Sequence, residues 1–123
     1  MKSLLIISGW AHGKKSIEPI GELFNPFFNV FLLSGADALK SEVLPKSDYI
    51  IGISMGGILA LDKFTSQCKK IVLISSSACF CKKDNYSFGT AEKIIQRMIK
   101  QIDISQEKVI DEFFTNAHLP QKL

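Results

Sequence analysis

Short apolar runs recur along the first two thirds of the chain, and each is followed by glycine, serine or a polar segment. Four runs predict buried strands of a parallel sheet, because they are apolar at successive rather than alternate positions. They cover residues 4–7, 30–33, 49–53 and 71–74. Helices are predicted between them at residues 16–24, with Ser16 as N-cap, and at 55–64, whereas residues 34–47 allow only a short helical turn.

The order of these elements predicts an α/β fold with a mostly parallel sheet and right-handed crossovers. In such a sheet the ligand site lies beyond the carboxyl ends of the strands. Small and polar residues follow those ends, at positions 8–10, 34–35, 54 and 75–77. We therefore expect four loops to converge on one edge of the sheet, with Ser54 among them.

After residue 81 the pattern changes from strands to helices. Residues 90–102 are apolar at positions 94, 95, 98, 99 and 102, which is the spacing of an amphipathic helix. Residues 105–117 predict a second amphipathic helix, capped by Asp103 or Ser105. The sequence therefore divides into an expected α/β core, residues 1–81, and an expected helical hairpin, residues 82–123.

The 123 residues are 46% hydrophobic with a formal net charge of +3, which is typical of one globular domain or part of one. The charge is too small to indicate nucleic-acid binding. No apolar stretch reaches the length of about 18 residues that a membrane span needs, and the N-terminal run is too short for a signal peptide. We expect a cytoplasmic protein without a membrane partner.

Three cysteines without a C-x-x-C pair favour neither a disulfide framework nor a zinc site, so no metal or cofactor is expected.

The most informative motif is Gly52-Ile53-Ser54-Met55-Gly56, a G-x-S-x-G pattern between a predicted strand and a predicted helix. An ordinary tight turn can carry the same pattern, but its context favours a nucleophile elbow. Ser54 is then the candidate nucleophile, on a sharp turn that requires a positive φ. The amide of Met55, at the start of the helix, is a candidate donor to a developing oxyanion.

A serine nucleophile needs a base, and the candidates are His12 and His118. His12 follows the first strand, but no acid stands beside it in the sequence to orient the ring, so a solvated loop residue is the favoured interpretation. His118 lies near the C-terminus, where a surface residue is favoured. Asp84, Asp103 and Asp111 fit turn, cap and solvated helix positions better than a triad acid.

Four segments together carry a family resemblance: Leu-Ile-Ile-Ser-Gly-Trp at 5–10, the elbow, residues 71–80 ending in Ser-Ala-Cys-Phe, and the helix at 108–114. They resemble the N-terminal part of the α/β-hydrolases, and within them the esterases of biotin synthesis that cleave pimeloyl-[acyl-carrier protein] methyl ester. The resemblance implies a partial α/β-hydrolase fold with a cap-like hairpin. It implies Ser54 as nucleophile, the amides of Trp10 and Met55 as oxyanion hole, and Trp10 and Phe80 as walls of an acyl pocket. Packing on the core is the alternative role for Trp10.

The chain departs from this family in two places. Ser8 stands where the family has a histidine. The family's triad Asp and His follow the cap, and Leu123 lies within the cap-like region, so the resemblance covers about the first half of the family's sequence. Three functions therefore stay open: a serine carboxylesterase of the biotin pathway, a catalytically inactive truncated hydrolase with a binding or interaction role, and a small hydrolase-like protein acting on another ester or thioester.

The expected partner is an acyl-ester small molecule or an acyl-carrier protein. Lys93, Arg97 and Lys100 are spaced four and three residues apart, so they share one face of the first hairpin helix. For any one of these residues an ordinary solvated helix face is the favoured interpretation, and together they offer a docking face for an acidic partner. Acyl-carrier proteins are acidic, and the resembled esterases receive them on basic cap residues. Lys108 matches one of those positions, whereas Glu112 stands where another base is expected. An uncovered edge of the partial sheet also predicts self-association.

Overall fold

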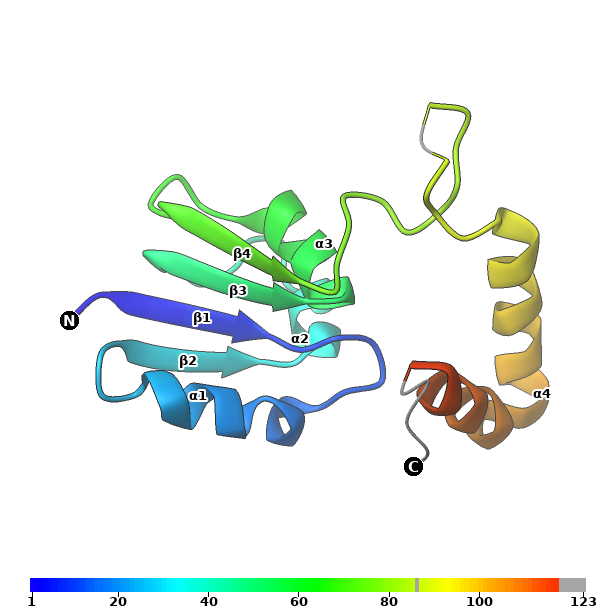
Figure 1. Ribbon diagram of the computed structural model, residues 1–123, viewed down its shortest axis with the longest axis horizontal. Helices are drawn as coiled ribbons and strands as arrows, with labels where there is room; N and C mark the ends of the chain where they lie inside the picture. Colours follow the sequence, from blue (N-terminus) through cyan, green and yellow to red (C-terminus); the bar gives the residue numbers. More distant parts are fainter. Residues whose placement is uncertain (86, 118–123) are drawn as a thin grey trace. The chain divides into compact units, whose positions relative to one another are not determined.

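The computed structural model describes residues 1–85 and 87–117, and the chain divides into two compact units, Met1–Ala78 and Cys79–Leu123 (Figure 1). The described part of the first unit contains a four-stranded parallel sheet in the order β2-β1-β3-β4. The strands are β1 (Ser3–Ile7), β2 (Asn29–Leu33), β3 (Tyr49–Ile53) and β4 (Lys70–Ile74). The predicted parallel α/β sheet is confirmed, and each predicted strand lies within one of these four.

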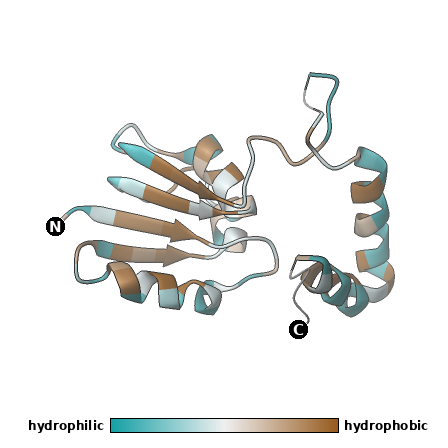
Figure 2. Ribbon diagram, in the orientation of Figure 1, coloured by the Kyte–Doolittle hydropathy of each residue, from teal (hydrophilic) through white to brown (hydrophobic). Residues whose placement is uncertain are grey.

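Helices cover both faces of this sheet, and the strands are apolar along most of their length (Figure 2). The helices are α1 (Glu18–Phe24), α2 (Gly35–Lys40) and α3 (Met55–Lys63). Alternate residues of a strand face opposite sides, and the core divides accordingly. Leu5, Ile7 and Ile50 pack with Ala38 of α2 and Leu59 and Ala60 of α3. Leu4, Ile6 and Ile51 pack with Ile17 and with Ile20 and Phe24 of α1.

The helix predicted at residues 16–24 begins later than expected. Lys14–Ser16 form a short 3-10 helix, η1, and α1 begins at Glu18. The Ser16 hydroxyl donates to the Gly13 carbonyl at 2.7 Å, so it closes this preceding turn instead of capping α1. Pro19 fits the first turn of α1 because an amide there has no intrahelical acceptor.

Residues 34–47 contain α2, which the sequence allowed only as a short helical turn. The Ser34 hydroxyl caps this helix by accepting from the Asp37 amide at 3.1 Å. At its other end, the ammonium of Lys63 donates to the carbonyls of Ala38 at 3.1 Å, Leu39 at 2.8 Å and Ser41 at 2.6 Å. A side chain from α3 thus satisfies carbonyls that the end of α2 would leave open.

The second unit contains α4 (Glu92–Ala117), which is broken at Ser105. Ser105 has φ −153° and ψ 84°, so the helix consists of two segments, as the two predicted amphipathic helices require. Val109 of the second segment is buried, whereas Ile94 and Ile99 of the first are exposed. Among the residues described, no helix is both long and apolar enough to cross a membrane.

Candidate active site

Ser54 occupies the single residue between β3 and α3. Its backbone angles are φ 53° and ψ −119°, which confirms the positive φ expected from the motif. Such a conformation costs a residue with a Cβ atom on the order of 1–3 kcal/mol, and it persists only where surrounding contacts impose it. The Ser54 side chain makes no capping hydrogen bond to α3, although Ser54 is the N-cap residue. The hydroxyl is therefore not engaged in the role that serine most often has at this position.

The two glycines of the motif let α3 approach the sheet at backbone distance. A Cβ atom on Gly52 would lie 2.7 Å from the carbonyl oxygen of Gly56 and would overlap the Cα of Gly57. A Cβ atom on Gly56 would lie 2.7 Å from the carbonyl oxygen of Ser8 and would overlap that of Ile7. The sharp strand-to-helix turn thus depends on both glycines, as the elbow interpretation requires.

Hydrogen bonds hold both polar backbone groups of Ser54. Its amide donates to the carbonyl of Ile74 at 2.9 Å, which continues the pairing of β3 with β4. Its carbonyl accepts from the amide of Gly57 at 3.0 Å and from the hydroxyl of Ser76 at 2.6 Å. These contacts come from two elements, so the strained residue is fixed from both sides.

The loop after β1 borders the Ser54 side chain. A Cβ atom on Gly9 would lie 3.2 Å from the Cβ of Ser54 and 3.7 Å from its Oγ. The loop then forms a turn, in which the His12 amide donates to the Gly9 carbonyl at 3.2 Å and Ala11 has φ 60°. Trp10 is the second residue of this turn and is half-buried. The structure therefore brings the segment of Trp10 beside Ser54, while its role as an oxyanion donor stays a prediction.

Ser8 joins three segments at this edge of the sheet. It is 1% exposed. Its hydroxyl donates to the His12 carbonyl at 2.6 Å and accepts from the Gly35 amide at 3.1 Å. Its amide donates to the Leu33 carbonyl at 3.1 Å. Ser8 thus ties the loop after β1 to the start of α2, a connection that the sequence alone did not reveal.

His12 is oriented by a backbone carbonyl. Its Nδ1 lies 2.8 Å from the carbonyl oxygen of Trp10. A carbonyl only accepts, so Nδ1 carries the proton and Nε2 is the basic nitrogen of the neutral ring. His118, the other candidate base, lies outside the described residues. Asp103 and Asp111 are exposed on α4, and Asp84 is exposed in the preceding loop. The cap role of Asp103 and the turn role of Asp84 stay predictions.

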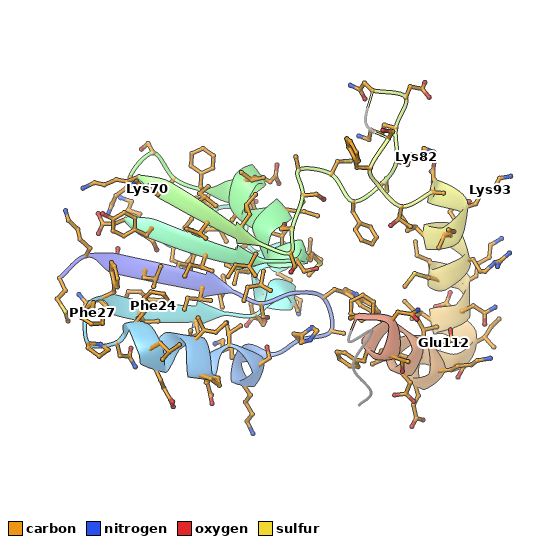
Figure 3. The ribbon with its side chains drawn as sticks, in the orientation of Figure 1. Phe24, Phe27, Lys70, Lys82, Lys93 and Glu112 are labelled. Carbon is orange, nitrogen blue, oxygen red and sulfur yellow. The ribbon has the colours of Figure 1, made fainter. Side chains whose placement is uncertain are left out.

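The predicted residues of the second unit are exposed. Phe80 has 52% of its surface accessible and belongs to Cys79–Leu123, so its place beside Ser54 stays a prediction. Lys93, Arg97 and Lys100 are exposed on α4, and Lys93 and Glu112 are labelled in Figure 3. Within the residues that the structure describes, no three His, Cys, Asp or Glu side chains are grouped so that they could hold a metal ion.

The charged groups with perturbed pKa values lie at the other end of the sheet. The Asp48 carboxylate accepts from the Ser3 amide at 2.9 Å and from the Ser3 hydroxyl at 3.1 Å. These hydrogen bonds, with Lys2 and Lys69 nearby, lower the pKa of Asp48 below its ordinary value of 3.8. Ser3 begins β1 and Asp48 precedes β3, so this cluster joins the amino ends of the strands and is remote from Ser54.

Comparison with known proteins gives a partial match to an esterase. No family model and no solved structure matches the chain. The pimeloyl-[acyl-carrier protein] methyl ester esterase of Wigglesworthia glossinidia brevipalpis is 28% identical over 81 residues. The relationship is α/β-hydrolase-like. The match covers 63% of this chain and 31% of the esterase, so the chain spans about a third of the length of the curated relative it matches.

Proposed function

We propose that this chain carries the nucleophile of a serine carboxylesterase-type hydrolase, with Ser54 as the attacking residue. The observation that carries the proposal is the Ser54 backbone, with φ 53° and ψ −119°, between a parallel strand and a helix. Fold and motif alone would fit many functions. A strained serine whose hydroxyl makes no capping bond, beside glycines that admit no side chain, supports a nucleophile elbow specifically.

The proposed reaction is acyl transfer in two steps. The Ser54 Oγ attacks the ester carbonyl carbon, the bond to the leaving alcohol breaks, and the hydroxyl proton passes through a base to that alcohol. Water then cleaves the acyl-serine bond, releases the acid and restores Ser54. Met55 is the first residue of α3, so its amide has no intrahelical acceptor and suits an oxyanion. The Trp10 amide is the second proposed donor.

Turnover also requires a base within about 3 Å of the serine oxygen. The Nδ1 of His12 donates to the Trp10 carbonyl within its own loop, and His118 lies outside the described residues. We therefore expect the 123-residue chain alone to be acylated slowly and to hydrolyse short p-nitrophenyl esters weakly or not at all.

The proposed substrate is a pimeloyl methyl ester carried by an acyl-carrier protein, as in biotin synthesis. The reaction for which the esterase relative is named and the sequence resemblance support this choice. Lys93, Arg97 and Lys100 are exposed on α4 and offer a basic face to an acidic carrier. Another ester or thioester is the alternative substrate, and competition by pimeloyl and by unrelated acyl esters distinguishes the two.

Salt-dependent titration tests the proposed carrier interaction. We expect weak binding of acyl-carrier protein that falls as salt rises, because exposed charges act mainly on encounter. The variant carrying Lys93→Glu, Arg97→Glu and Lys100→Glu should lose this binding, whereas Lys14→Glu, a basic residue in the first unit, should retain it. Equal affinities for all three proteins, or no salt dependence, would remove α4 as the docking face.

Labelling with an alkyl fluorophosphonate tests Ser54 directly. The reagent forms an Oγ–P bond, expels fluoride and transfers the hydroxyl proton to solvent, so one event is detected without turnover. We expect a Ser54-dependent adduct that Ser54→Ala abolishes and Ser16→Ala retains, because Ser16 lies in η1 with its hydroxyl bonded to Gly13. Labelling that is equal in Ser54→Ala and wild type would refute the proposal.

A non-catalytic interaction role is the second candidate. Val72, Leu73 and Ile74 of the edge strand β4 are 51%, 39% and 41% exposed. An exposed apolar edge strand favours pairing with another chain. Sedimentation of the purified chain tests this role: concentration-dependent association without Ser54 labelling supports it, and a labelled monomer contradicts it.

A further inference from the structure

We propose that Ser76 is a positioning residue, which fixes the peptide between Ser54 and Met55 and thereby aims the Met55 amide at the oxyanion. The proposal rests on the function proposed for Ser54. Ser76 lies outside the G-x-S-x-G motif and 22 positions after the nucleophile. The structure brings it to the elbow from the loop after β4.

The contact acts on the peptide that carries the proposed oxyanion donor. The Ser76 hydroxyl donates to the Ser54 carbonyl at 2.6 Å, and the Gly57 amide donates to the same oxygen at 3.0 Å. Two donors match the two lone pairs of that oxygen. A trans peptide is planar, with its C=O and N–H pointing in opposite directions. Holding the Ser54 carbonyl therefore fixes the direction of the Met55 N–H.

One segment holds Ser54 on both sides. Ile74 accepts from the Ser54 amide at 2.9 Å, and Ser76, two residues later, donates to the Ser54 carbonyl. Between them, Ser75 has φ 49°, so the chain turns sharply at the end of β4. The two residues that flank Ser75 in sequence thus both bond to the backbone of Ser54. Without Ser76, the Ser54 carbonyl would lose its restraint from outside α3 and keep the Gly57 amide of the same helical turn.

The contact also explains a glycine that the motif does not require. A Cβ atom on Gly57 would lie 2.6 Å from the Cβ of Ser76 and would overlap its Oγ. Gly57 is therefore the residue against which the Ser76 side chain is seated. Any larger residue at position 57 would displace the hydroxyl from the Ser54 carbonyl.

The hydroxyl has an electronic effect in the same direction. Donation to a carbonyl polarises the peptide and makes the N–H on its other side a stronger hydrogen-bond donor. In a chain of hydrogen bonds, this strengthens each hydrogen bond by roughly 10–30%. The Met55 N–H is then already aligned and polarised when the oxyanion develops. Ser76 touches neither substrate nor the attacking oxygen in this role, so it is not a catalytic residue.

The test compares Ser76→Ala with Ser16→Ala, in which a hydroxyl-to-carbonyl bond of 2.7 Å is lost from η1. In amide NMR spectra of the whole chain, Ser76→Ala should shift the Met55 resonance well beyond any shift in Ser16→Ala. The fluorophosphonate labelling rate at Ser54 should fall about 10-fold in Ser76→Ala, less than the 10²–10³ caused by deleting a donor, and stay within twofold in Ser16→Ala.

The two readouts separate this proposal from the proposed function. An unchanged Met55 resonance in a folded Ser76→Ala variant would overturn the positioning role, whatever the labelling rate. If the wild type shows no Ser54-dependent labelling, the hydrolase function fails, and the Met55 resonance alone still decides whether Ser76 fixes the peptide. Circular dichroism verifies that both variants are folded.

Discussion

The two ends of the parallel sheet differ in backbone conformation and in charge. At the carboxyl ends lie Ala11, Ser54 and Ser75, the non-glycine residues with positive φ among those described. At the amino ends, Ser3 and Asp48 join β1 and β3 through three hydrogen bonds, with Lys2 and Lys69 nearby. The carboxyl ends carry residues with positive φ, whereas the amino ends carry a cluster of charged groups and no residue with positive φ among those described.

This difference shows that the sheet itself does not require strained residues, so the strain belongs to the candidate site. The amino ends connect their strands without strained residues, so strain is not a general cost of this sheet. At the carboxyl ends strain follows three of the four strands, where ligand sites of parallel sheets lie. Observed strain in such a place supports a functional interpretation. Variants at the two ends of the sheet test this difference.

Gly52→Ala should have the largest effect. Its Cβ would lie among backbone atoms of α3, which cannot move as a flexible side chain can. We expect the free energy of unfolding to fall by about 3 kcal/mol, the upper part of the range for overpacking. Gly13→Ala is the matched control, because a Cβ there meets nothing within 4 Å. Equal denaturant midpoints for the two variants would contradict the close approach at the elbow.

Ser54→Gly and Ser54→Ala should separate strain from chemistry. Both variants should lose fluorophosphonate labelling, since both lack the hydroxyl. The glycine variant should be more stable than the alanine variant by about 1 kcal/mol, because glycine adopts positive φ without a Cβ penalty. In β1 the same pair at Ser3 should show the opposite order. Thermal unfolding in which Ser54→Ala is the more stable variant would show that Ser54 stores no strain.

Asp48→Asn should change the pH dependence of stability and leave the elbow intact. The pKa of Asp48 is lowered in the folded state, so the ionised carboxylate contributes stability above its ordinary value of 3.8. That contribution disappears as pH falls through the folded pKa. The wild type should therefore be more stable than Asp48→Asn at pH 7, and the difference should shrink below about pH 4. A difference independent of pH, in urea titrations, would exclude the charged form as its source.

His12→Ala should have the smallest effect on the site. The ring is oriented by the Trp10 carbonyl, and we expect the Ser54 labelling rate to stay within twofold of wild type. A pH profile of labelling completes the measurement. A large loss of rate, together with a changed pH profile, would identify His12 as the base.

Local chemistry made part of this structure predictable. Residues 49–53 form a strand and Ser54 has positive φ, because an apolar run and two closely spaced glycines determine the conformation within a few residues. The start of α1 was predicted wrongly because the Ser16 hydroxyl has a nearer carbonyl to bond. The full length of α2 was not predicted, because Lys63, 22 positions after Ser41, satisfies its end.

The support around the candidate site was beyond sequence reasoning for the same reason. The Gly35–Ser8 bond joins residues 27 positions apart, and the Ser76–Ser54 bond joins residues 22 apart. A serine after a strand indicates an edge where ligands can bind, but it does not indicate its partner. The sequence therefore identified the candidate nucleophile, and only the fold revealed which residues hold its backbone.

The most direct test of the central claim, that the strained elbow makes Ser54 a nucleophile, is mass spectrometry of the fluorophosphonate-treated chain in buffer and in strong denaturant. We expect one adduct, located on Ser54 by peptide fragmentation, that forms in the folded protein and is at least 10-fold slower to form when the elbow is unfolded. Equal labelling in both conditions, or an adduct spread over several serines, would contradict the account.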